Sequence, residues 1–246
     1  QHLWSDFRGK TIINTFMQLF PKNKFATKAL FPLYPFAFQS MRLPPNRRAV
    51  WISASTFAKM VPIPRGSVSF LYCHSPTRFL WDTDRYVGSE VANTLLRSLV
   101  GAFLPQMRRL DLSAMARMDY VIANSHNVRH RIKEVYGRDA IVIHPPVDVN
   151  RFAVSPRNDG PYLILSRLVA YKGIDIAVKA FSGLDRILHV VGEGTDRHRL
   201  ESIAPSNVRF LGRLTDRQIE SELAGCRALI FPGEEDFGIT PVEAQA

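Results

Sequence analysis

The sequence is poor in cysteine and has no long apolar run. Its 246 residues include two cysteines, Cys73 and Cys226, which are far apart and form neither a C-x-x-C motif nor the dense framework of small disulfide-bonded domains. No stretch approaches the roughly 18 uncharged apolar residues that a transmembrane helix needs, and the nearest candidate, residues 30–38, is short and contains two prolines. These features argue against a membrane-spanning chain and favour a reducing, cytoplasmic location.

Leader and cofactor motifs are missing as well. The opening residues, QHLWSDF, contain no signal peptide and no initiator methionine, so we expect a piece of a longer polypeptide. Asp82 and Asp84 spell a D-x-D pair typical of metal sites, but the pair follows Trp81 in an expected loop and does not close a strand. The histidines show no ligand spacing with a carboxylate or cysteine. We therefore expect no metal and, without a full G-x-G-x-x-G fingerprint, no nicotinamide cofactor.

Positive charge is concentrated in the first part of the chain. Residues 1–150 contain 20 Lys and Arg against 9 Asp and Glu, whereas residues 151–246 contain 12 against 13. Between residues 19 and 48, basic side chains alternate with large apolar ones, which suits the surface of an anionic membrane or a nucleic acid, and the spacing favours the membrane. The alternative is a set of core aromatics beside a solvated basic rim. The basic members are Lys22, Lys24, Lys28, Arg42, Arg47 and Arg48.

From Ala49 onward, short β-branched runs alternate with helical periodicity, which is the pattern of parallel sheets covered by helices. One or two helices interrupted at Pro105 are expected over 89–117, and another over 127–136, ended by Gly137. The Pro-, Asp- and Asn-rich segment 144–161 should cross the surface between two units. Strands are expected at 49–53, 68–74, 119–125 and 140–144.

A second, regular series of elements follows that segment, and the sequence stops in the first turns of a helix that begins near Pro241. We therefore expect two α/β domains, residues 1–147 and 148–246, the first without its start and the second without its end. The second domain should contain a doubly wound sheet. Its strands are expected at 162–166, 187–192, 208–212 and 227–231, and its complete helices at 173–181, 196–203 and 216–223.

The segment FPGEEDFGITPVEAQA places Glu235 and Glu243 eight positions apart across a turn from an apolar strand into a helix. Backbone N–H groups of such a turn point at whatever lies above it, and Gly238 permits close approach of a phosphate. Two carboxylates would repel a diphosphate, so they fit best as hydrogen-bond acceptors for neutral hydroxyls on either side of it. The alternative is a solvated acidic turn, with Glu243 favoured by the helix dipole.

Two cations follow the first strand of the second domain. In SRLVAYKGID, Arg167 leaves the carboxyl end of the strand and Lys172 precedes Gly173 at a helix start. Doubly wound sheets bind ligands at that edge, and a departing diphosphate needs such neutralisation where no metal is bound. The glycine turn VVGEG, residues 190–194, ends another strand, although any strand-to-helix turn can contain glycine.

Together these motifs resemble the family 4 retaining glycosyltransferases, which have the GT-B fold. The resemblance rests on the order and spacing of SRL-x-x-YKGID, VVGEG, VRFLGR and the E-x7-E pair in EEDFGITPVEAQ, and it extends to YCHSPTRFLWD, VIANSHNV and residues 146–152. YCHSPTRFLWD and FGITPVEAQA look most like bacterial GDP-mannose-dependent mannosyltransferases that assemble lipid-linked surface polysaccharide. The family's glycine-rich acceptor loop and the final elements of its C-terminal domain have no counterpart in this sequence.

The resemblance implies two Rossmann-like, doubly wound domains that face a cleft, with the acceptor on the first domain and the nucleotide sugar on the second. Arg167 and Lys172 would hold the donor diphosphate and stabilise the leaving group, and Glu235 would contact the transferred hexose. His74 would reach that sugar from the first domain, although without the family it reads as a satisfied histidine at a strand end. The remaining donor contacts would be Gly192 near the diphosphate, Gly212 and Arg213 near the base, the backbone of Phe237, Gly238, Ile239 and Thr240, and Glu243 at the ribose.

The implied reaction is transfer of mannose from GDP-mannose, with retention, to a lipid-linked glycan or polysaccharide. The implied partners are the nucleotide sugar, that acceptor and, as an open alternative, the anionic inner face of the plasma membrane. A GT-B enzyme with another donor, such as UDP-glucose, is the nearer rival. A basic nucleic-acid-binding α/β protein is the more remote one, because the sequence contains no recognisable RNA- or DNA-binding motif.

Overall fold

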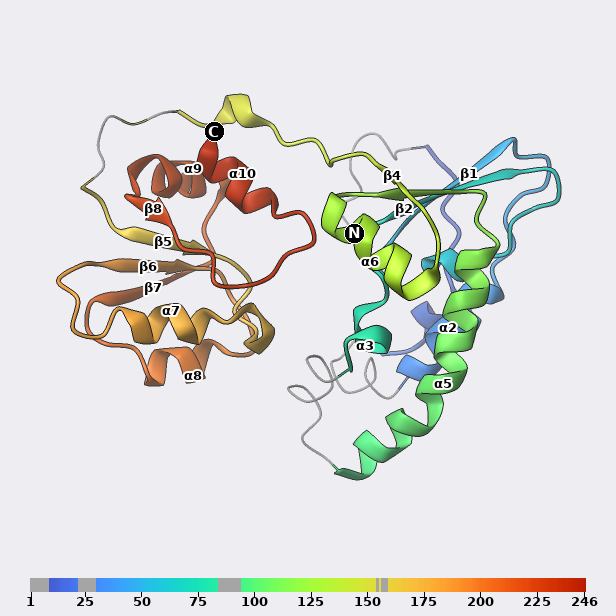
Figure 1. Ribbon diagram of the computed structural model, residues 1–246, viewed down its shortest axis with the longest axis horizontal. Helices are drawn as coiled ribbons and strands as arrows, with labels where there is room; N and C mark the ends of the chain where they lie inside the picture. Colours follow the sequence, from blue (N-terminus) through green and yellow to red (C-terminus); the bar gives the residue numbers. More distant parts are fainter. Residues whose placement is uncertain (1–8, 22–29, 84–93, 154, 156–158) are drawn as a thin grey trace. The chain divides into compact units, whose positions relative to one another are not determined.

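The computed structural model describes residues 9–21, 30–83, 94–153, 155 and 159–246, which form two compact α/β units (Figure 1). The first unit ends at Ile143 and the second begins at His144, at the start of the segment in which the sequence analysis places the domain boundary. Part of the basic stretch, Lys22, Lys24 and Lys28, and also Asp84 of the D-x-D pair, lie outside the described residues.

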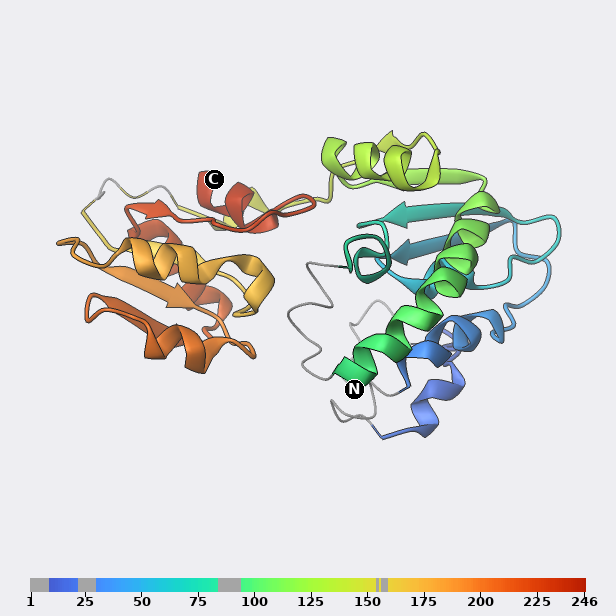
Figure 2. The same ribbon diagram turned by 60° about the horizontal axis from the view of Figure 1, so that its bottom comes forward.

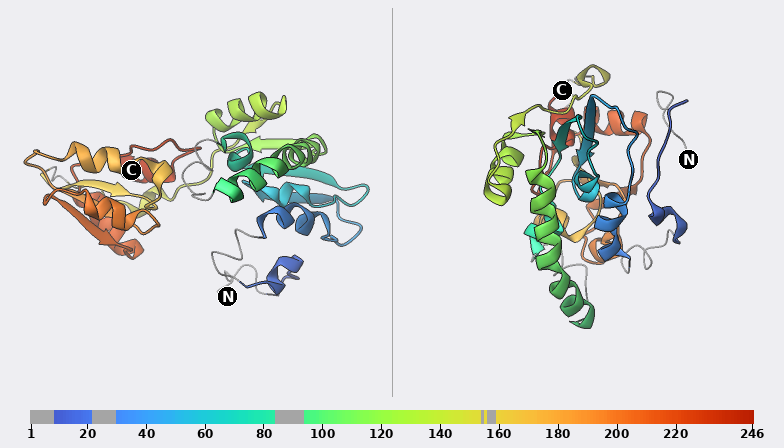
Figure 3. Two further views of the ribbon diagram at one scale, coloured as in Figure 1. Left: turned by 90° about the horizontal axis from the view of Figure 1, so that it is seen from below. Right: turned by 90° about the vertical axis from the view of Figure 1, so that its right-hand side faces the viewer.

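The first unit is built on four parallel strands in the order β1-β2-β3-β4. Alternate side chains along the strands, such as Ile52 and Leu71, are buried against Met115 of α5 and Ile132 of α6. Figures 2 and 3 show α5 lying along this covered face. The elements of the unit are η2 Phe16–Leu19, η3 Phe31–Leu33, α2 Tyr34–Gln39, β1 Ala49–Ala54, η4 Phe57–Met60, β2 Val68–Cys73, α3 Arg78–Trp81, α5 Thr94–Ala116, β3 Tyr120–Ala123, α6 His126–Tyr136 and β4 Ile141–Val142.

The opposite face of this sheet carries a ladder of aromatic rings. Trp51, Phe70 and Tyr120 are register partners on β1, β2 and β3, and their rings stack with centroid distances of 4.4 and 5.1 Å. Trp51 is 68% exposed and Tyr120 50% exposed. Cross-strand aromatic pairs of this kind stabilise the sheet and fix its register.

The expected interruption at Pro105 is wrong. Helix α5 runs from Thr94 to Ala116 with Pro105 inside it. A proline in a helix interior removes one hydrogen bond and costs about 3 kcal/mol. Tertiary packing overrides that cost here, because the turns after the proline bury Met107, Asp111 and Met115.

The second unit contains four parallel strands in the order β7-β6-β5-β8. Helices α7 and α8 cover one face, and α9 and α10 lie on the other (Figure 1). Helix α10 begins at Ile239, close to Pro241 as expected, and this proline lies in the first turn of the helix, where proline is favoured. The elements are η5 Val149–Arg151, β5 Tyr162–Leu165, η6 Ala170–Lys172, α7 Ile174–Ala180, β6 Leu188–Val191, α8 Arg197–Ser202, β7 Val208–Gly212, α9 Asp216–Gly225, β8 Ala228–Leu229 and α10 Ile239–Gln245.

Candidate functional site

The order of the second sheet creates a switch point between β5 and β8. From β5 the chain proceeds to β6 and β7 on one side, and then crosses back to place β8 on the other side. The loops at the carboxyl ends of β5 and β8 therefore diverge, and open parallel sheets bind ligands in the crevice that this leaves. A small hollow lies at this point. It is lined by Ile164, Leu165, Ser166, Lys172, Ile174, Ile230, Phe231, Pro232 and Gly233.

Lys172 and Glu235 form an ion pair across the switch point. The side chain of Lys172, at the end of η6, is 13% exposed, and that of Glu235, in the turn after β8, is 28% exposed. Their segments approach closely because Gly233 has no side chain: a Cβ there would lie 2.9 Å from the carbonyl oxygen of Lys172. Lys172 and Glu235 belong to two separate motifs of the sequence, and the fold brings them into contact. The pair offers a cation for a phosphate beside a carboxylate that can accept hydrogen bonds from hydroxyls.

Arg167 occupies the carboxyl end of β5, as expected, and its side chain is exposed. Its guanidinium donates a hydrogen bond to the hydroxyl of Tyr171 at 2.8 Å. The ammonium group of Lys172 lies 5.5 Å from the centre of the Tyr171 ring. Tyr171 thus contacts both cations and orients them, a role that was not predicted because the motif was interpreted through its charged and glycine residues.

The glycine turn after β6 packs directly on the segment that carries Arg167. A Cβ on Gly192 would lie 1.9 Å from the carbonyl oxygen of Ser166, and one on Gly194 would lie 2.0 Å from that of Leu168. Gly192 also has φ +129, which L side chains rarely adopt. Both glycines are therefore required by backbone packing alone, and the expected contact of Gly192 with a diphosphate stays a prediction.

Gly212 and Arg213 follow β7 at the same edge of the sheet. Gly212 is buried with φ +71, and a Cβ there would lie 3.1 Å from Glu193 Oε1 and 3.3 Å from Arg197 Nη1. Arg197 also donates to Glu201 at 2.7 Å, and this hydrogen bond is the main cause that raises the pKa of Arg197 above its ordinary value. Glu193 and Arg197 also form an ion pair with each other, and this pair borders the place that the resemblance assigns to the base.

The turn before α10 contains the remaining predicted donor contacts. Gly238 has φ +81 and caps the helix, so a residue with a side chain would be strained there. The ring of Phe237 lies 5.5 Å from that of His144, Ile239 is exposed, and Thr240 and Glu243 are half-buried. The structure brings Glu235 to Lys172 but records no contact that joins Glu243 to that pair among the described residues. The ribose role of Glu243 stays a prediction.

His74 belongs to the first unit, where it follows β2. Its Nε2 lies 2.7 Å from the hydroxyl of Ser53 on β1, and its carbonyl oxygen accepts a hydrogen bond from Asn124 at 3.1 Å. These contacts hold the imidazole at the carboxyl edge of the first sheet. Its expected reach to the donor sugar stays a prediction.

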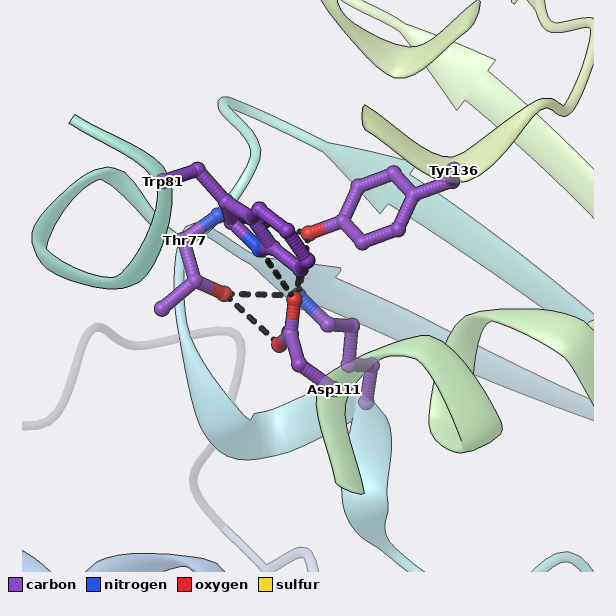
Figure 4. A network of polar contacts seen from close by, with 5 residues as sticks. Thr77, Trp81, Asp111 and Tyr136 are labelled. Carbon is purple, nitrogen blue, oxygen red and sulfur yellow. Dashed lines mark hydrogen bonds and ion pairs between the residues drawn. The ribbon is translucent and has the colours of Figure 1, made fainter. Parts of the chain in front are cut away.

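A buried polar network in the first unit was not predicted. Lys59 and Asp111 form an ion pair at 2.8 Å whose side chains are 2% and 0% exposed (Figure 4). Thr77, Trp81 and Tyr136 complete it through hydrogen bonds to these two residues. Burial, and after it the negative charge of Asp111, raises the pKa of Tyr136 far above its ordinary value, so its hydroxyl stays protonated. The one signal in the sequence was a charge inside apolar runs, in FAKM and RLDLSAM.

Two further properties concern only the residues that the structure describes. None of their helices is long and apolar enough to cross a membrane. Within the same ranges, no group of three or more His, Cys, Asp and Glu side chains is arranged to hold a metal ion.

Comparison with known proteins supports one family. Residues 148–246 match the family described as glycosyl transferases group 1. Over 206 residues, the chain is 27% identical to the GDP-mannose-dependent monoacylated alpha-(1-6)-phosphatidylinositol monomannoside mannosyltransferase of Corynebacterium glutamicum. That alignment covers 70% of this chain and 54% of the enzyme, so the chain spans about half the length of this relative.

Solved structures of low sequence identity share the fold. The apo form of the lipopolysaccharide outer core galactosyltransferase WaaB matches with a TM-score of 0.52 and 15% identity over 91% of this chain and 60% of that chain. Anabaena Alr3699/HepE, solved in complex with UDP and glucose, matches with a TM-score of 0.53 and 20% identity over 72% of this chain and 50% of that chain. The expected GT-B fold is therefore confirmed, and the group 1 glycosyltransferases are the family that the comparisons support for this chain.

Proposed function

We propose that this chain is part of a retaining glycosyltransferase that transfers mannose from GDP-mannose to a lipid-linked glycan or polysaccharide. The observation that carries the proposal is the Lys172–Glu235 pair at the switch point between β5 and β8. A nucleotide sugar presents a doubly charged diphosphate directly beside a neutral ring with several hydroxyls. A cation next to a carboxylate, both partly shielded from water, matches that sequence of groups.

Lys172 and Arg167 take up the charge that develops on the diphosphate when the bond to the sugar breaks. Arg167 is held by Tyr171, and Lys172 lies against the same ring, so neither cation must reorganise far during the reaction. Groups fixed in advance toward a developing charge supply the largest single part of many rate enhancements. With two side-chain cations in this place, we propose that the transfer needs no metal.

Retention follows from same-face substitution. The bond between the anomeric carbon and the diphosphate oxygen breaks, and the acceptor oxygen forms its bond to that carbon from the same side. The acceptor hydroxyl gives its proton to the departing phosphate oxygen, so that charge and atoms balance. Glu235 is not the nucleophile in this scheme, because its carboxylate is paired with Lys172 and is proposed to accept hydrogen bonds from the sugar hydroxyls.

The proposed donor substrate is GDP-mannose. GDP-mannose is supported by the likeness of YCHSPTRFLWD and FGITPVEAQA to mannosyltransferases and by the donor that the name of the C. glutamicum relative states. The nearer alternative, UDP-glucose or another donor, has its own support in Anabaena Alr3699/HepE, which was solved with UDP and glucose. The base would lie by Gly212 and Arg213, where the Glu193–Arg197 ion pair borders Gly212.

We place the enzyme in the cytoplasm, at the inner face of the plasma membrane, because a lipid-linked acceptor must be reached there. Exposed apolar side chains, including Leu19 at 86% and Phe36 at 51%, occur in the same stretch as the exposed Arg42, Arg47 and Arg48. Such a surface suits an anionic membrane interface. Sedimentation with liposomes of neutral lipid and with liposomes that contain acidic lipid tests this. If the protein sediments to the same extent whichever lipid is present, the proposed membrane association would be refuted.

The donor site is tested by calorimetric titration of the full-length protein with GDP, UDP, GDP-mannose and UDP-glucose in buffer without metal. Lys172→Ala is the informative variant, and Lys179→Ala on α7 is its control, since that lysine is 63% exposed and pairs with Asp175. Removal of a charged hydrogen-bond partner costs about 1.5–3 kcal/mol. We therefore expect one nucleotide to bind the wild type and the control alike, and to bind Lys172→Ala about 10- to 150-fold more weakly. No binding by any of the four would refute the function.

A further inference from the structure

The polar network of the first unit has no unused hydrogen-bonding group. The ammonium group of Lys59 donates to Asp111 at 2.8 Å, to the Thr77 hydroxyl at 2.8 Å and to the Tyr136 hydroxyl at 3.2 Å, which uses its three protons. Asp111 Oδ1 also accepts from Thr77 at 2.9 Å, and Oδ2 accepts from Trp81 at 2.9 Å and from Tyr136 at 2.7 Å. Figure 4 shows Thr77, Trp81 and Tyr136 converging on the Asp111 carboxylate.

Stability alone does not explain this network. Lys59 and Asp111 are almost fully buried, so both charges lose their hydration. Apolar side chains of similar volume often stabilise a protein as well as a buried ion pair or better. Buried polar groups can instead select one conformation of the chain, because each partner must stay within hydrogen-bond distance to avoid an unpaired buried group.

The conformation that the network selects is that of the segment after β2. Thr77 and Trp81 belong to this segment, residues 74–81, whereas Lys59 comes from η4, Asp111 from α5 and Tyr136 from the end of α6. The backbone N–H of Thr77 also donates to the Tyr136 hydroxyl at 3.4 Å. Thr77 and Trp81 are thus hydrogen-bonded to side chains of three other elements, η4, α5 and α6.

The start of the same segment carries the predicted catalytic histidine. His74 directly follows β2, and Arg78 donates through Nε to the hydroxyl of Ser75 at 3.2 Å. Ser75 and Thr77 are 3% and 0% exposed, so a shift of Thr77 must be taken up by the residues next to it. A displacement of about 1 Å at a reacting group can cost about 100-fold in rate.

We propose that Lys59, Asp111 and Tyr136 are positioning residues that anchor Thr77 and Trp81 and thereby hold His74 in the geometry needed for sugar transfer. This inference rests on the proposed function, because it assigns the network to the same reaction. The residues that it names all belong to the first unit, whereas Lys172 and Glu235 belong to the second.

The test compares Thr77→Val with Thr77→Ser. Valine keeps the volume but removes the hydroxyl that accepts from Lys59 and donates to Asp111, whereas serine keeps that hydroxyl. Ile132→Val is the matched control, because Ile132 is 0% exposed in the core of the same unit and has no part in the network. It lowers stability through a small cavity without releasing the segment.

We expect kcat to fall about 100-fold in Thr77→Val, with the donor KM changed less than about twofold, because the donor residues lie in the second unit. Thr77→Ser should restore kcat to within about threefold of wild type. Trypsin should cleave after Arg78 about tenfold faster in folded Thr77→Val than in wild type, and Ile132→Val should change neither quantity. Wild-type kcat and cleavage in folded Thr77→Val, or an equal loss of kcat in Ile132→Val, would overturn the inference.

Trp81→Phe is the second variant, in case Thr77→Val does not fold. It removes one hydrogen bond to Asp111 and keeps an aromatic ring. We expect the fold-loss of kcat and the fold-gain in trypsin cleavage after Arg78 to be about a third of those in Thr77→Val. Failure of the proposed function can be distinguished from failure of this inference. If the wild-type protein binds no nucleotide, the proposed function fails, while the cleavage rates still decide whether the network anchors the segment.

Discussion

Glu235→Gln tests the two roles that we propose for the switch point, phosphate binding by Lys172 and sugar binding by Glu235. Lys172 is paired with Glu235, so a diphosphate that binds at Lys172 would compete with that carboxylate for the ammonium group. Glutamine keeps the shape and the acceptor oxygen but removes the charge. The side chains are 13% and 28% exposed, so water screens the pair only in part, and we take the upper part of the range of about 0.2–1 kcal/mol of exposed pairs as its strength. We expect GDP to bind about two- to fivefold more tightly to the variant.

Sugar transfer should move in the opposite direction. A charged acceptor makes hydrogen bonds worth about 1.5–3 kcal/mol, and a neutral amide oxygen makes weaker ones. The variant should therefore transfer sugar about 10- to 100-fold more slowly while it binds the product nucleotide more tightly. Tighter GDP binding together with slower transfer is expected only if the carboxylate both accepts hydrogen bonds from the sugar and pairs with the cation that binds the phosphate.

Calorimetry with GDP and GMP, together with a transfer assay, measures both effects. GMP lacks the second phosphate, so its affinity should change less than that of GDP. Glu234→Gln is the control, because the neighbouring residue is exposed and was not predicted to contact the donor. Weaker binding of GDP to Glu235→Gln, or equal gains for GDP and GMP, would refute the placement of the diphosphate at Lys172.

Three further predictions concern the fold and the absence of a metal requirement. Gly192→Ala should destabilise the protein by more than about 3 kcal/mol in urea unfolding, because its Cβ would meet the Ser166 carbonyl at 1.9 Å, whereas Gly183→Ala, with φ +77 and open space, should cost only about 1–2 kcal/mol. The Ser69 backbone N–H and hydroxyl donate to Asp119 and lower the pKa of that carboxyl, so its stabilising effect is present above the unfolded pKa and disappears as pH falls through the folded one. Melting temperatures between pH 2 and 7 should therefore drop less steeply on the acid side in Asp119→Asn, and equal slopes would contradict the assignment. Incubation with EDTA should leave the rate of sugar transfer unchanged, and restoration of a lost rate by Mg²⁺ or Mn²⁺ would show that the cations of the protein do not suffice.

Local sequence determined the elements and the residue types at the site. The alternation of apolar runs with helical periodicity indicated the parallel strands and their helices, because each strand has such a run whatever its place in the order of strands. Arg167, Lys172 and Glu235 were selected by their positions at strand ends, where side chains of parallel sheets meet ligands. The error at Pro105 arose because an intrinsic preference was weighed without the packing of Met107 and Met115 that outweighs it.

Only the tertiary structure decided which of these residues touch. Lys172 and Glu235 are far apart along the chain, and their contact depends on the strand order β7-β6-β5-β8, which no local pattern encodes. The roles of Gly192 and Gly194 also emerged there, since close approach of two backbones is a property of packing. The Lys59–Asp111 network was invisible for the same reason: a buried charge is tolerable only beside partners that the fold assembles from four separate elements.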